Sequence, residues 1–393
     1  MDAFFASVEL LRYPQLKGLP VVIGGSRFTP QQEAALVQRW GSLAQMPLAA
    51  FERLGGYVGR GVITTATYAA RQFGVGSAMG LMKAARLCPQ AVLLPIDFAR
   101  YRAYSQRFKE VIVALAPVLE DRGVDEVYID FTHAEGGQEA GGQALAQRLQ
   151  AAIFAATGLT CSIGVAPNKL LAKMASEFNK PRGIAIVWPH DLQEKIWPLP
   201  CRKINGIGPK ANAKLEQLGI TTIGQLAAYP AHKLVQHFGK ATGAWLHDAA
   251  WGRDERPVVT ESEPVSISRE TTFERDLHAV HDRAELGRIF TALCEQVAQD
   301  LQRKGYAGRT IGIKLRYADF RGATRDQTIA QATQDAAMLR RVAGQCLKRV
   351  PLQQRLRLLG VRVASLVPVA EAALHPAAAH SPGPAQGETL GLF

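Results

Sequence analysis

Residues 123–130 read Gly-Val-Asp-Glu-Val-Tyr-Ile-Asp, which places two adjacent carboxylates, Asp125 and Glu126, in an otherwise apolar stretch that predicts a β-strand. Carboxylates among apolar residues are costly unless they bind a cation, and oxygen-only ligands suit Mg²⁺. Consecutive side chains of a regular strand point to opposite faces, so joint chelation requires a bend, which Gly123 can provide. An acidic pair that decorates the surface is the alternative.

A second stretch, TTATYAAR at residues 64–71, is typical of a strand that ends where a helix begins. Its threonines can cap the helix, and Tyr68 and Arg71 then lie on one face of the first turn. An arginine and a tyrosine hydroxyl at a helix start favour phosphate binding. An ordinary capped helix with an exposed arginine explains the same residues.

Residues 168–180 (NKLLAKMASEFNK) predict an amphipathic helix that Pro181 ends. Lys169, Lys173 and Lys180 are expected along its polar side. Lys180, at the end of the helix, could reach a triphosphate. A solvated stripe of lysines is the alternative.

The segment Gly206-Ile207-Gly208, followed by Lys210, predicts a short hairpin between helices. Its glycines let backbone N–H groups approach a phosphate closely, and such a contact holds a nucleic-acid backbone without reading its sequence. A tight helix–helix turn with no ligand is the alternative.

The excess positive charge lies near the C-terminal end. The 393 residues carry 46 Lys and Arg against 34 Asp and Glu, a net charge of +12, and residues 301–325 and 335–362 each contribute +6 of it. Two predicted strands run through these segments, RTIGIKLRY at 309–317 and QRLRLLGVRVASL at 354–366. In the first, alternation puts Ile311, Ile313 and Leu315 on one face and Lys314 and Arg316 on the other. A sheet that presents cations to phosphates is the functional interpretation, and a solvated strand face is the alternative. The cations concerned are Arg309, Lys314, Arg316, Arg355 and Arg357.

Composition excludes several classes of protein. The chain is 47% hydrophobic and 20% charged, so it can form sizeable cores. No apolar run is long enough for a membrane span, and the N-terminus lacks the basic start of a secretory signal. The five cysteines are far apart, which argues against disulfides and zinc. We therefore expect a cytoplasmic protein with no membrane association.

The element pattern is that of an α+β protein. Strands and helices alternate up to about residue 187, residues 188–254 are helix-rich, and residues 255–264 resemble a linker. Strands and helices return over 265–367, and the chain from Ala364 onward is rich in Ala and Pro, which predicts a disordered tail.

Six of these stretches together resemble the Y-family translesion DNA polymerases, in the DNA polymerase IV (DinB) branch. They appear in the order of that family: MDAFFASVE at the start, TTATYAARQFGV, GVDEVYID, SIGVAPNKLLAKMASEFNKPRGI, the GIG hairpin and the RTIGIKLRYADF strand. The resemblance implies a multi-domain right-hand polymerase. Its domains would be a palm (1–10 and 97–187), fingers (11–96, with an insertion at 26–58), a helix-hairpin-helix thumb (188–254), a linker (255–264), a little finger (265–367) and a tail (368–393).

The resemblance also implies a role for each site residue. Asp125 and Glu126, with the backbone carbonyl of Met1, would hold two Mg²⁺ ions for nucleotidyl transfer from a dNTP to a primer 3′-OH, without proofreading. The incoming nucleotide would meet Tyr68, Arg71, Lys180, Phe4 and Phe5, with Phe5 as the steric gate against ribonucleotides. Primer-template DNA would meet Gly206, Gly208, Lys210, Arg309, Lys314, Arg316, Arg355 and Arg357. The protein is expected to act as a monomer.

The C-terminal segment TLGLF resembles the peptide with which this family binds the sliding clamp. Leu390, Leu392 and Phe393 would fill a groove on the clamp, and Thr389 stands where Gln is usual.

Two departures from the family pattern stand out. Residues 26–58 are longer than the matching loop of compact relatives, and they predict a helix around residues 31–45. The family motif reads Asp-Met-Asp before the paired aromatics, whereas this chain begins at that Met. We therefore expect the first Asp, a ligand to both metals, to precede Met1 together with the opening palm strand, and activity of the chain as written to be near zero.

That missing carboxylate favours an alternative of another class, a non-catalytic DNA- and clamp-binding accessory protein. The otherwise complete nucleotide site opposes it, because a scaffold needs no such site.

Overall fold

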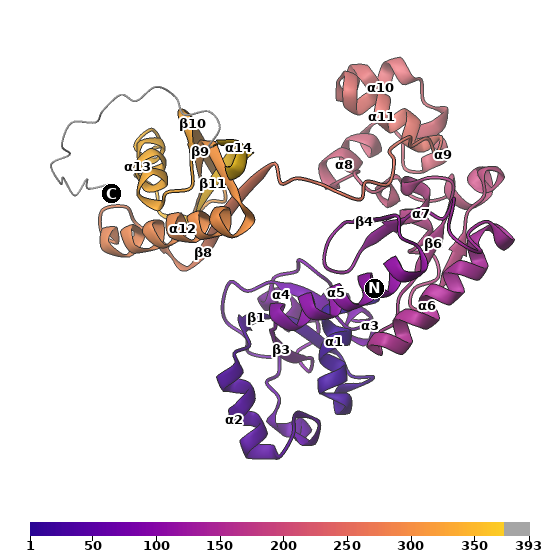
Figure 1. Ribbon diagram of the computed structural model, residues 1–393, viewed down its shortest axis with the longest axis horizontal. Helices are drawn as coiled ribbons and strands as arrows, with labels where there is room; N and C mark the ends of the chain where they lie inside the picture. Colours follow the sequence, from indigo (N-terminus) through magenta and orange to yellow (C-terminus); the bar gives the residue numbers. More distant parts are fainter. Residues whose placement is uncertain (373–393) are drawn as a thin grey trace. The chain divides into compact units, whose positions relative to one another are not determined.

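The computed structural model describes residues 1–372, and the chain divides into two compact units, Met1–Glu261 and Ser262–Phe393. The division falls inside the predicted linker, where residues 253–264 form neither helix nor strand. Helices and strands are mixed in both units (Figure 1), which confirms the α+β class.

The first sheet of unit 1 has the order β2-β1-β3. Its central strand β1 (Val21–Arg27) pairs antiparallel with β2 (Ile63–Ala66) and parallel with β3 (Val92–Ile96). Three helices pack around this sheet, and each helix buries its apolar face against the strands. They are α1 (Phe4–Arg12), α3 (Tyr68–Arg71) and α4 (Leu81–Leu87).

The long segment 26–58 is an ordered part of this region. Thr29 caps helix α2 (Pro30–Trp40) through a reciprocal capping box with Gln32. The helix ends at Trp40, earlier than the predicted residue 45, because Gly41 takes a positive φ of 77°. Beyond it Leu43, Met46 and Phe51 join the buried core, so the segment is packed against the fold.

An ion-pair network ties this segment to its neighbours. Arg12, of which 7% of the side chain is exposed, lies 3.1 Å from Glu9, 3.1 Å from Glu33 of α2 and 3.4 Å from Asp97. Arg100 of α5 (Phe98–Leu115) also pairs with Glu33, at 3.3 Å. Glu33 thereby joins the insertion to two other helices.

The rest of the predicted palm consists of two long helices and two short ribbons. Helices α5 and α6 (Gln143–Thr157) pack against each other. Strands β4 (Leu119–Asp121) and β5 (Val127–Ile129) pair antiparallel, and β6 (Ile163–Val165) pairs parallel with β7 (Ile184–Ile186). The two ribbons form separate two-stranded sheets.

Residues 188–252 form the predicted helix-rich region around a core of their own. Its α-helices are α8 (Pro209–Gln217), α9 (Ile223–Ala228), α10 (Ala231–Phe238) and α11 (Lys240–Ala250). Helix α7 (Lys169–Ala175) contributes Leu170, Leu171 and Met174 to the same core, which joins this region to the palm.

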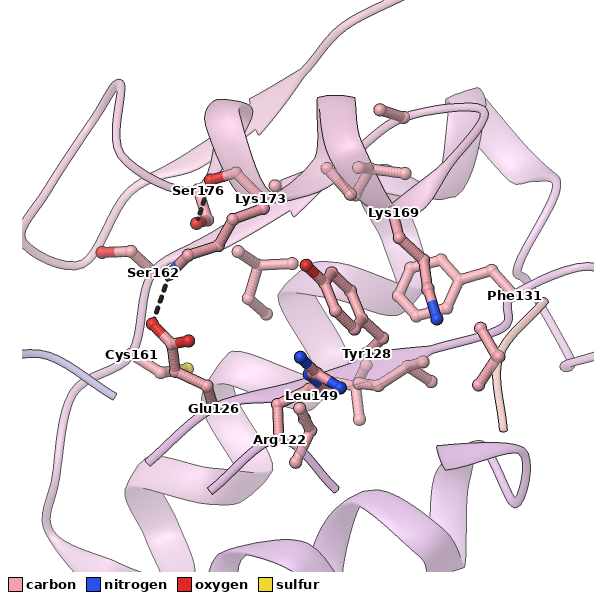
Figure 2. Close-up of a pocket in the computed structure, with 18 of the residues that line it drawn as sticks. Arg122, Glu126, Tyr128, Phe131, Leu149, Cys161, Ser162, Lys169, Lys173 and Ser176 are labelled. Atoms are coloured by element: carbon pink, nitrogen blue, oxygen red, sulfur yellow. Dashed lines mark hydrogen bonds and ion pairs between the residues drawn. The ribbon is translucent and has the colours of Figure 1, made fainter. Parts of the chain in front are cut away.

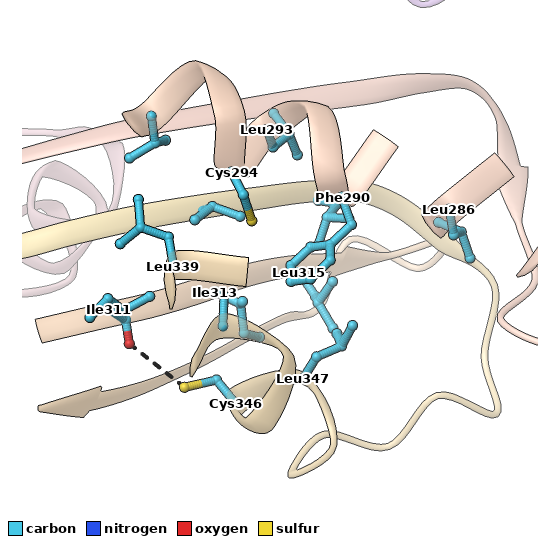
Figure 3. Packing of buried hydrophobic residues seen from close by; sticks show 14 of the residues in the cluster. Leu286, Phe290, Leu293, Cys294, Ile311, Ile313, Leu315, Leu339, Cys346 and Leu347 are labelled. Atoms are coloured by element: carbon cyan, nitrogen blue, oxygen red, sulfur yellow. Dashed lines mark hydrogen bonds between the residues drawn. The ribbon is translucent and has the colours of Figure 1, made fainter. Parts of the chain in front are cut away.

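Unit 2 is one antiparallel sheet of order β10-β9-β11-β8 with two helices that share its core. Figure 3 shows side chains of α12 and α13 meeting Ile311, Ile313 and Leu315 of β9, the face that the alternation predicted. The elements are β8 (Ser266–Leu277), α12 (Arg283–Lys304), β9 (Tyr306–Tyr317), β10 (Gly322–Thr333), α13 (Ala336–Leu347) and β11 (Leu356–Pro368).

The prediction that the tail begins at Ala364 was wrong. β11 continues to Pro368 because it pairs with β9 as far as Pro368 opposite Tyr306, and α14 (Val369–Ala372) follows.

All five cysteines are buried and unpaired. Within residues 1–372, no helix has both the length and the apolar composition needed to cross a membrane.

Candidate active site

Asp125 and Glu126 lie in the turn that joins β4 to β5, just before the strand in which they were predicted. The turn closes through a hydrogen bond from the Arg122 N–H to the Glu126 carbonyl, at 3.1 Å. Gly123 takes a φ of 147°, which L side chains rarely adopt, so the bend is where the sequence predicted it. The two carboxylates are therefore free of the opposite-face rule of a regular strand.

The carboxylate of Glu126 already has a cationic partner. Lys173 of α7 donates a short hydrogen bond to its Oε1, and the two side chains point toward each other in Figure 2. Burial alone would raise the pKa of Glu126, but the hydrogen bond and charge of Lys173 bring it below its ordinary value. Glu126 is thus ionised at neutral pH and available to a metal only in competition with Lys173.

The start of the chain lies beside this turn. The amino group of Met1 donates to the Asp125 carbonyl at 2.7 Å. Asp2 is buried, and its two carboxylate oxygens accept hydrogen bonds from Ser162 Oγ at 2.7 Å and from the Arg182 N–H at 3.0 Å. Both oxygens therefore already accept hydrogen bonds within the protein, which argues against Asp2 as a metal ligand.

The donor set suits a hard divalent cation, since Asp125 and Glu126 offer carboxylate oxygens from adjacent positions. No group of three or more His, Cys, Asp or Glu that could hold a metal occurs among residues 1–372. The residues present fit a divalent ion in chemical type and supply two carboxylates.

Tyr68 and Arg71 form the phosphate-binding candidate at the short helix α3. Thr67 caps the helix by accepting from the Ala70 N–H at 3.4 Å, as predicted. The Arg71 guanidinium lies 4.7 Å from the centre of the Tyr68 ring, and its Nε donates to the Ala66 carbonyl at 3.1 Å. The buried Tyr68 hydroxyl has no hydrogen-bond partner within residues 1–372. A buried unpaired hydroxyl is costly, so a ligand that bonds to it would remove that cost.

Lys180 lies in the segment after α7, not on that helix, because α7 ends at Ala175. Ser176 Oγ donates to the Lys173 carbonyl at 2.8 Å, a local bond that competes with helix continuation. Lys180 pairs with Glu177 at 2.6 Å. Lys169, predicted on the polar side, is instead buried and pairs with Glu120 at 2.6 Å.

The paired aromatics have different environments. Phe4 is 2% exposed and packs edge-on against Phe108. Phe5 is half-buried, and its ring stacks on Tyr101 with 4.1 Å between centroids. The Tyr101 hydroxyl donates to Glu9 at 2.8 Å, which fixes the surface on which Phe5 rests.

One cavity of about 1030 Å³ in unit 1 brings most of the predicted site together. The predicted residues that line it are Met1, Phe4, Tyr68, Arg71, Asp125, Glu126 and Lys180. Phe5 is absent from this lining. Lys173, which the sequence assigned no role, lines the cavity, and its contact with Glu126 over 47 positions leaves no local signal.

The predicted Gly-Ile-Gly hairpin is a tight turn ahead of α8. Ile207 is buried and Lys210 is exposed. Gly206 has a φ of 112°, and a Cβ there would lie 2.8 Å from the Trp245 ring, so this position requires glycine. Gly208 forms the N-cap of α8 with open space around it.

The basic residues of β9 lie on both faces of the strand. Lys314 and Arg316 alternate with the buried residues of β9 and so lie on the face away from the helices, and Lys314 pairs with Glu270 at 2.7 Å. Arg316 Nε is buried with no hydrogen-bond partner in the described chain. Arg309 is exposed at the other parity of the strand.

Arg355 immediately precedes β11, and Arg357 lies at the start of that strand. Arg355 donates to the Asp276 carbonyl at 3.2 Å, and Arg357 lies 4.5 Å from the Phe320 ring centre. The clamp-binding candidates Leu390, Leu392 and Phe393 lie outside the described residues.

Comparison with known proteins shows the family of this chain. Residues 1–177 match the impB/mucB/samB family, residues 264–375 match the C-terminal domain of that family, and residues 199–252 match the helix-hairpin-helix motif of DNA polymerase eta and Rev1. DNA polymerase IV of Caulobacter vibrioides is 37% identical over 93% of this chain and 82% of its own length. DNA polymerase IV of Neisseria meningitidis is 37% identical over 94% of this chain and 95% of its own length.

Solved structures share the fold. A chimera of the Y-family DNA polymerases Dbh and Dpo4 superimposes with a TM-score of 0.76 at 24% identity, over 93% of this chain and 97% of the chimera. DinB from Sulfolobus solfataricus superimposes with a TM-score of 0.60 at 24% identity, over 92% and 96% of the two chains. The chain therefore belongs to the Y-family DNA polymerases, in the DNA polymerase IV branch.

Proposed function

We propose that this protein carries out template-directed, low-fidelity translesion DNA synthesis, transferring a nucleotide from a dNTP to a primer 3′-OH without proofreading. One observation carries the proposal most directly. A single cavity gathers two adjacent carboxylates, an arginine, a lysine and an unpaired tyrosine hydroxyl in a chain whose relatives are named DNA polymerase IV. The accessory-protein alternative is not favoured, because it gives those side chains no reason to converge.

Divalent metal ions are the cofactors, and we assign two Mg²⁺ ions to Asp125, Glu126 and the backbone carbonyl of Met1. Such ions, when bound, lower the pKa of the primer hydroxyl and neutralise the triphosphate. Tyr68 and Arg71 bind the phosphates from the side of α3, and Lys180 binds them from the segment after α7. These groups place the α-phosphorus for in-line attack and stabilise the pyrophosphate as it leaves.

The aromatic pair selects the sugar. Phe4, being buried, is the structural member that fixes the start of α1. Phe5 rests on Tyr101, and its remaining face excludes a ribose 2′-OH by contact. Because the steric exclusion depends on where the ring lies, the stacking on Tyr101 supports this role.

The remaining assignments concern DNA and the clamp. Primer-template DNA binds through the Gly206–Gly208 turn with Lys210 and through the basic residues of unit 2, and the domain boundaries follow the family plan given above. The C-terminal TLGLF segment binds the sliding clamp, the protein acts as a monomer, and its place is the cytoplasm.

The test is Mg²⁺-dependent primer extension together with DNA binding, comparing the parent chain with Asp125→Ala. The matched control is Glu110→Ala, which removes an exposed carboxylate of α5. We expect any extension that the parent chain shows to be lost in Asp125→Ala and kept in the control, while the DNA affinity of both variants stays within twofold of the parent's. Because the assignment also concerns metal, Mn²⁺ binding by electron paramagnetic resonance is measured on each variant. Unchanged extension or unchanged Mn²⁺ binding in Asp125→Ala contradicts the metal site.

A further inference from the structure

A chain of four alternating charges runs from the metal-ligand candidate to the triphosphate-binding candidate. Lys173 hydrogen-bonds to Glu126, and its Nζ lies 3.8 Å from Oε1 of Glu177. The same Oε1 accepts a hydrogen bond from Lys180 at 2.6 Å. Glu177 is thus the shared carboxylate of two lysines, one facing the metal ligand and one facing the nucleotide.

We propose that Glu177 is a positioning residue that couples nucleotide binding to metal binding by exchanging its lysine partner. The inference rests on the proposed roles of Glu126 and Lys180. A triphosphate that binds Lys180 draws that ammonium away from Glu177. The vacated carboxylate attracts Lys173, which then leaves Glu126 open to a divalent ion.

The geometry favours such an exchange. Lys173 needs to move only from Glu126 to an oxygen that is already 3.8 Å from its Nζ. Hydrogen bonds from the Glu177 N–H to the Met174 carbonyl, at 3.1 Å, and from the Phe178 N–H to the Ala175 carbonyl, at 3.0 Å, fix the backbone around Glu177. Its side chain is 46% exposed and that of Lys173 is 23% exposed, so both side chains have room to change rotamer.

Each partner exchange replaces one ion pair with another, which keeps its cost low. Glu126 leaves Lys173 for the metal, Lys173 leaves Glu126 for Glu177, and Lys180 leaves Glu177 for the phosphates. No charge is left without a counter-charge at the end. While Lys180 still pairs with Glu177, by contrast, Lys173 competes with any metal that approaches Glu126.

The experiment measures Mn²⁺ affinity by electron paramagnetic resonance, without nucleotide, in four chains: the parent, Lys180→Met, Glu177→Gln and the double variant. Lys180→Met imitates the withdrawal of Lys180 by a triphosphate without adding a chelator. We expect it to tighten Mn²⁺ binding about threefold, the scale of a partly exposed ion pair. In the Glu177→Gln background the same substitution should change Mn²⁺ affinity by less than about 1.3-fold.

The double variant separates the exchange from simple electrostatics. If simple electrostatics alone acted, loss of the Lys180 charge would tighten Mn²⁺ binding equally whether or not Glu177 is present. An equal effect of Lys180→Met in both backgrounds therefore overturns the proposal. Lys173→Met should also tighten Mn²⁺ binding and remove the effect of Lys180→Met, whereas an effect that survives Lys173→Met contradicts the route through Lys173.

Two controls keep the proposals distinguishable. Glu110→Gln removes an exposed carboxylate of α5 and should leave Mn²⁺ affinity unchanged. Mn²⁺ binding that does not fall in Asp125→Ala refutes the metal site itself. Mn²⁺ binding that falls in Asp125→Ala, combined with equal effects of Lys180→Met in both backgrounds, refutes only the exchange.

Discussion

Replacement of Lys169 by Met should destabilise unit 1 by about 3 kcal/mol. The side chains of Lys169 and Glu120 are 9% and 8% exposed, with 2.6 Å between Nζ and Oε2. Removing one member of a buried ion pair costs about 3–5 kcal/mol, because the other charge stays buried without its partner. Glu120 keeps the Val259 N–H at 2.9 Å and Arg122 at 3.4 Å, which places the expected loss at the lower end.

The loss can be measured on unit 1 alone. All five tryptophans lie before residue 262, so urea unfolding followed by tryptophan fluorescence reports that unit. The double variant Lys169→Met/Glu120→Met replaces both charges with apolar side chains. It should recover most of the lost free energy, since an apolar pair of similar volume is often as stable as a buried ion pair. A loss below about 1 kcal/mol in Lys169→Met would refute the reasoning.

The same pair predicts a pH dependence. Burial would raise the pKa of Glu120, but hydrogen bonds from Lys169 and the Val259 N–H bring it below its ordinary value of 4.5. A carboxylate with a depressed folded-state pKa contributes stability that is fully present above its unfolded pKa and is lost as the pH falls through the folded value. The difference in unfolding free energy between the parent and Lys169→Met should therefore be constant above about pH 5.5 and shrink below about pH 4. A difference that stays constant down to pH 3 contradicts this assignment.

Three further substitutions test the steric gate and the ion-pair network of the insertion. Phe5→Ala should admit ribonucleotides, measured as the ratio of rCTP to dCTP incorporation, and continued rejection contradicts the gate. Tyr101→Phe keeps the stacked ring beneath Phe5 but removes the hydrogen bond to Glu9. It should lower the free energy of unfolding in urea by about 1.5–3 kcal/mol and leave the ratio of rCTP to dCTP incorporation unchanged. A shifted incorporation ratio would mean that the hydroxyl helps to position Phe5. Glu33→Gln removes the carboxylate that joins the insertion to Arg12 and Arg100. Because the Glu33 side chain is 33% exposed, the free energy of unfolding in urea should fall by about 1 kcal/mol. A fall of more than about 3 kcal/mol would show that the ion pairs are more strongly coupled than this exposure indicates.

Local sequence patterns predicted the features that depend on neighbouring residues. Thr67 caps α3, Gly123 provides a bend beside the carboxylates, and Ile311, Ile313 and Leu315 face the core of unit 2. Each of these follows from a preference that acts over a few positions, such as capping, positive φ or strand alternation.

The features that the sequence missed depend on residues far apart in the chain. Asp2 carries a carboxylate that could bind a metal. Its two oxygens instead accept hydrogen bonds from the Ser162 hydroxyl and the Arg182 N–H, 160 and 180 positions away. Helix periodicity predicts Lys169 on a solvated face, but the ion pair with Glu120 offsets the cost of burying its charge. Sequence periodicity could not reveal Ser162, Arg182 or Glu120 as partners, because it carries no information on which distant segments pack together.

Lys173 and Lys180, two cations that line the cavity, are already paired, and this pairing bears on how the cavity discriminates among ligands. Lys173 is paired with Glu126 and Lys180 with Glu177, so neither lysine offers a bare charge to an arriving anion. A monoanion would have to break an ion pair for a comparable gain, whereas a triphosphate with its cation replaces both pairs at once. Since only the difference between the old and new contacts counts toward affinity, the pairing penalises partial ligands and favours the complete metal–nucleotide combination. The side chains that we propose bind the nucleotide thereby also set the threshold for binding it.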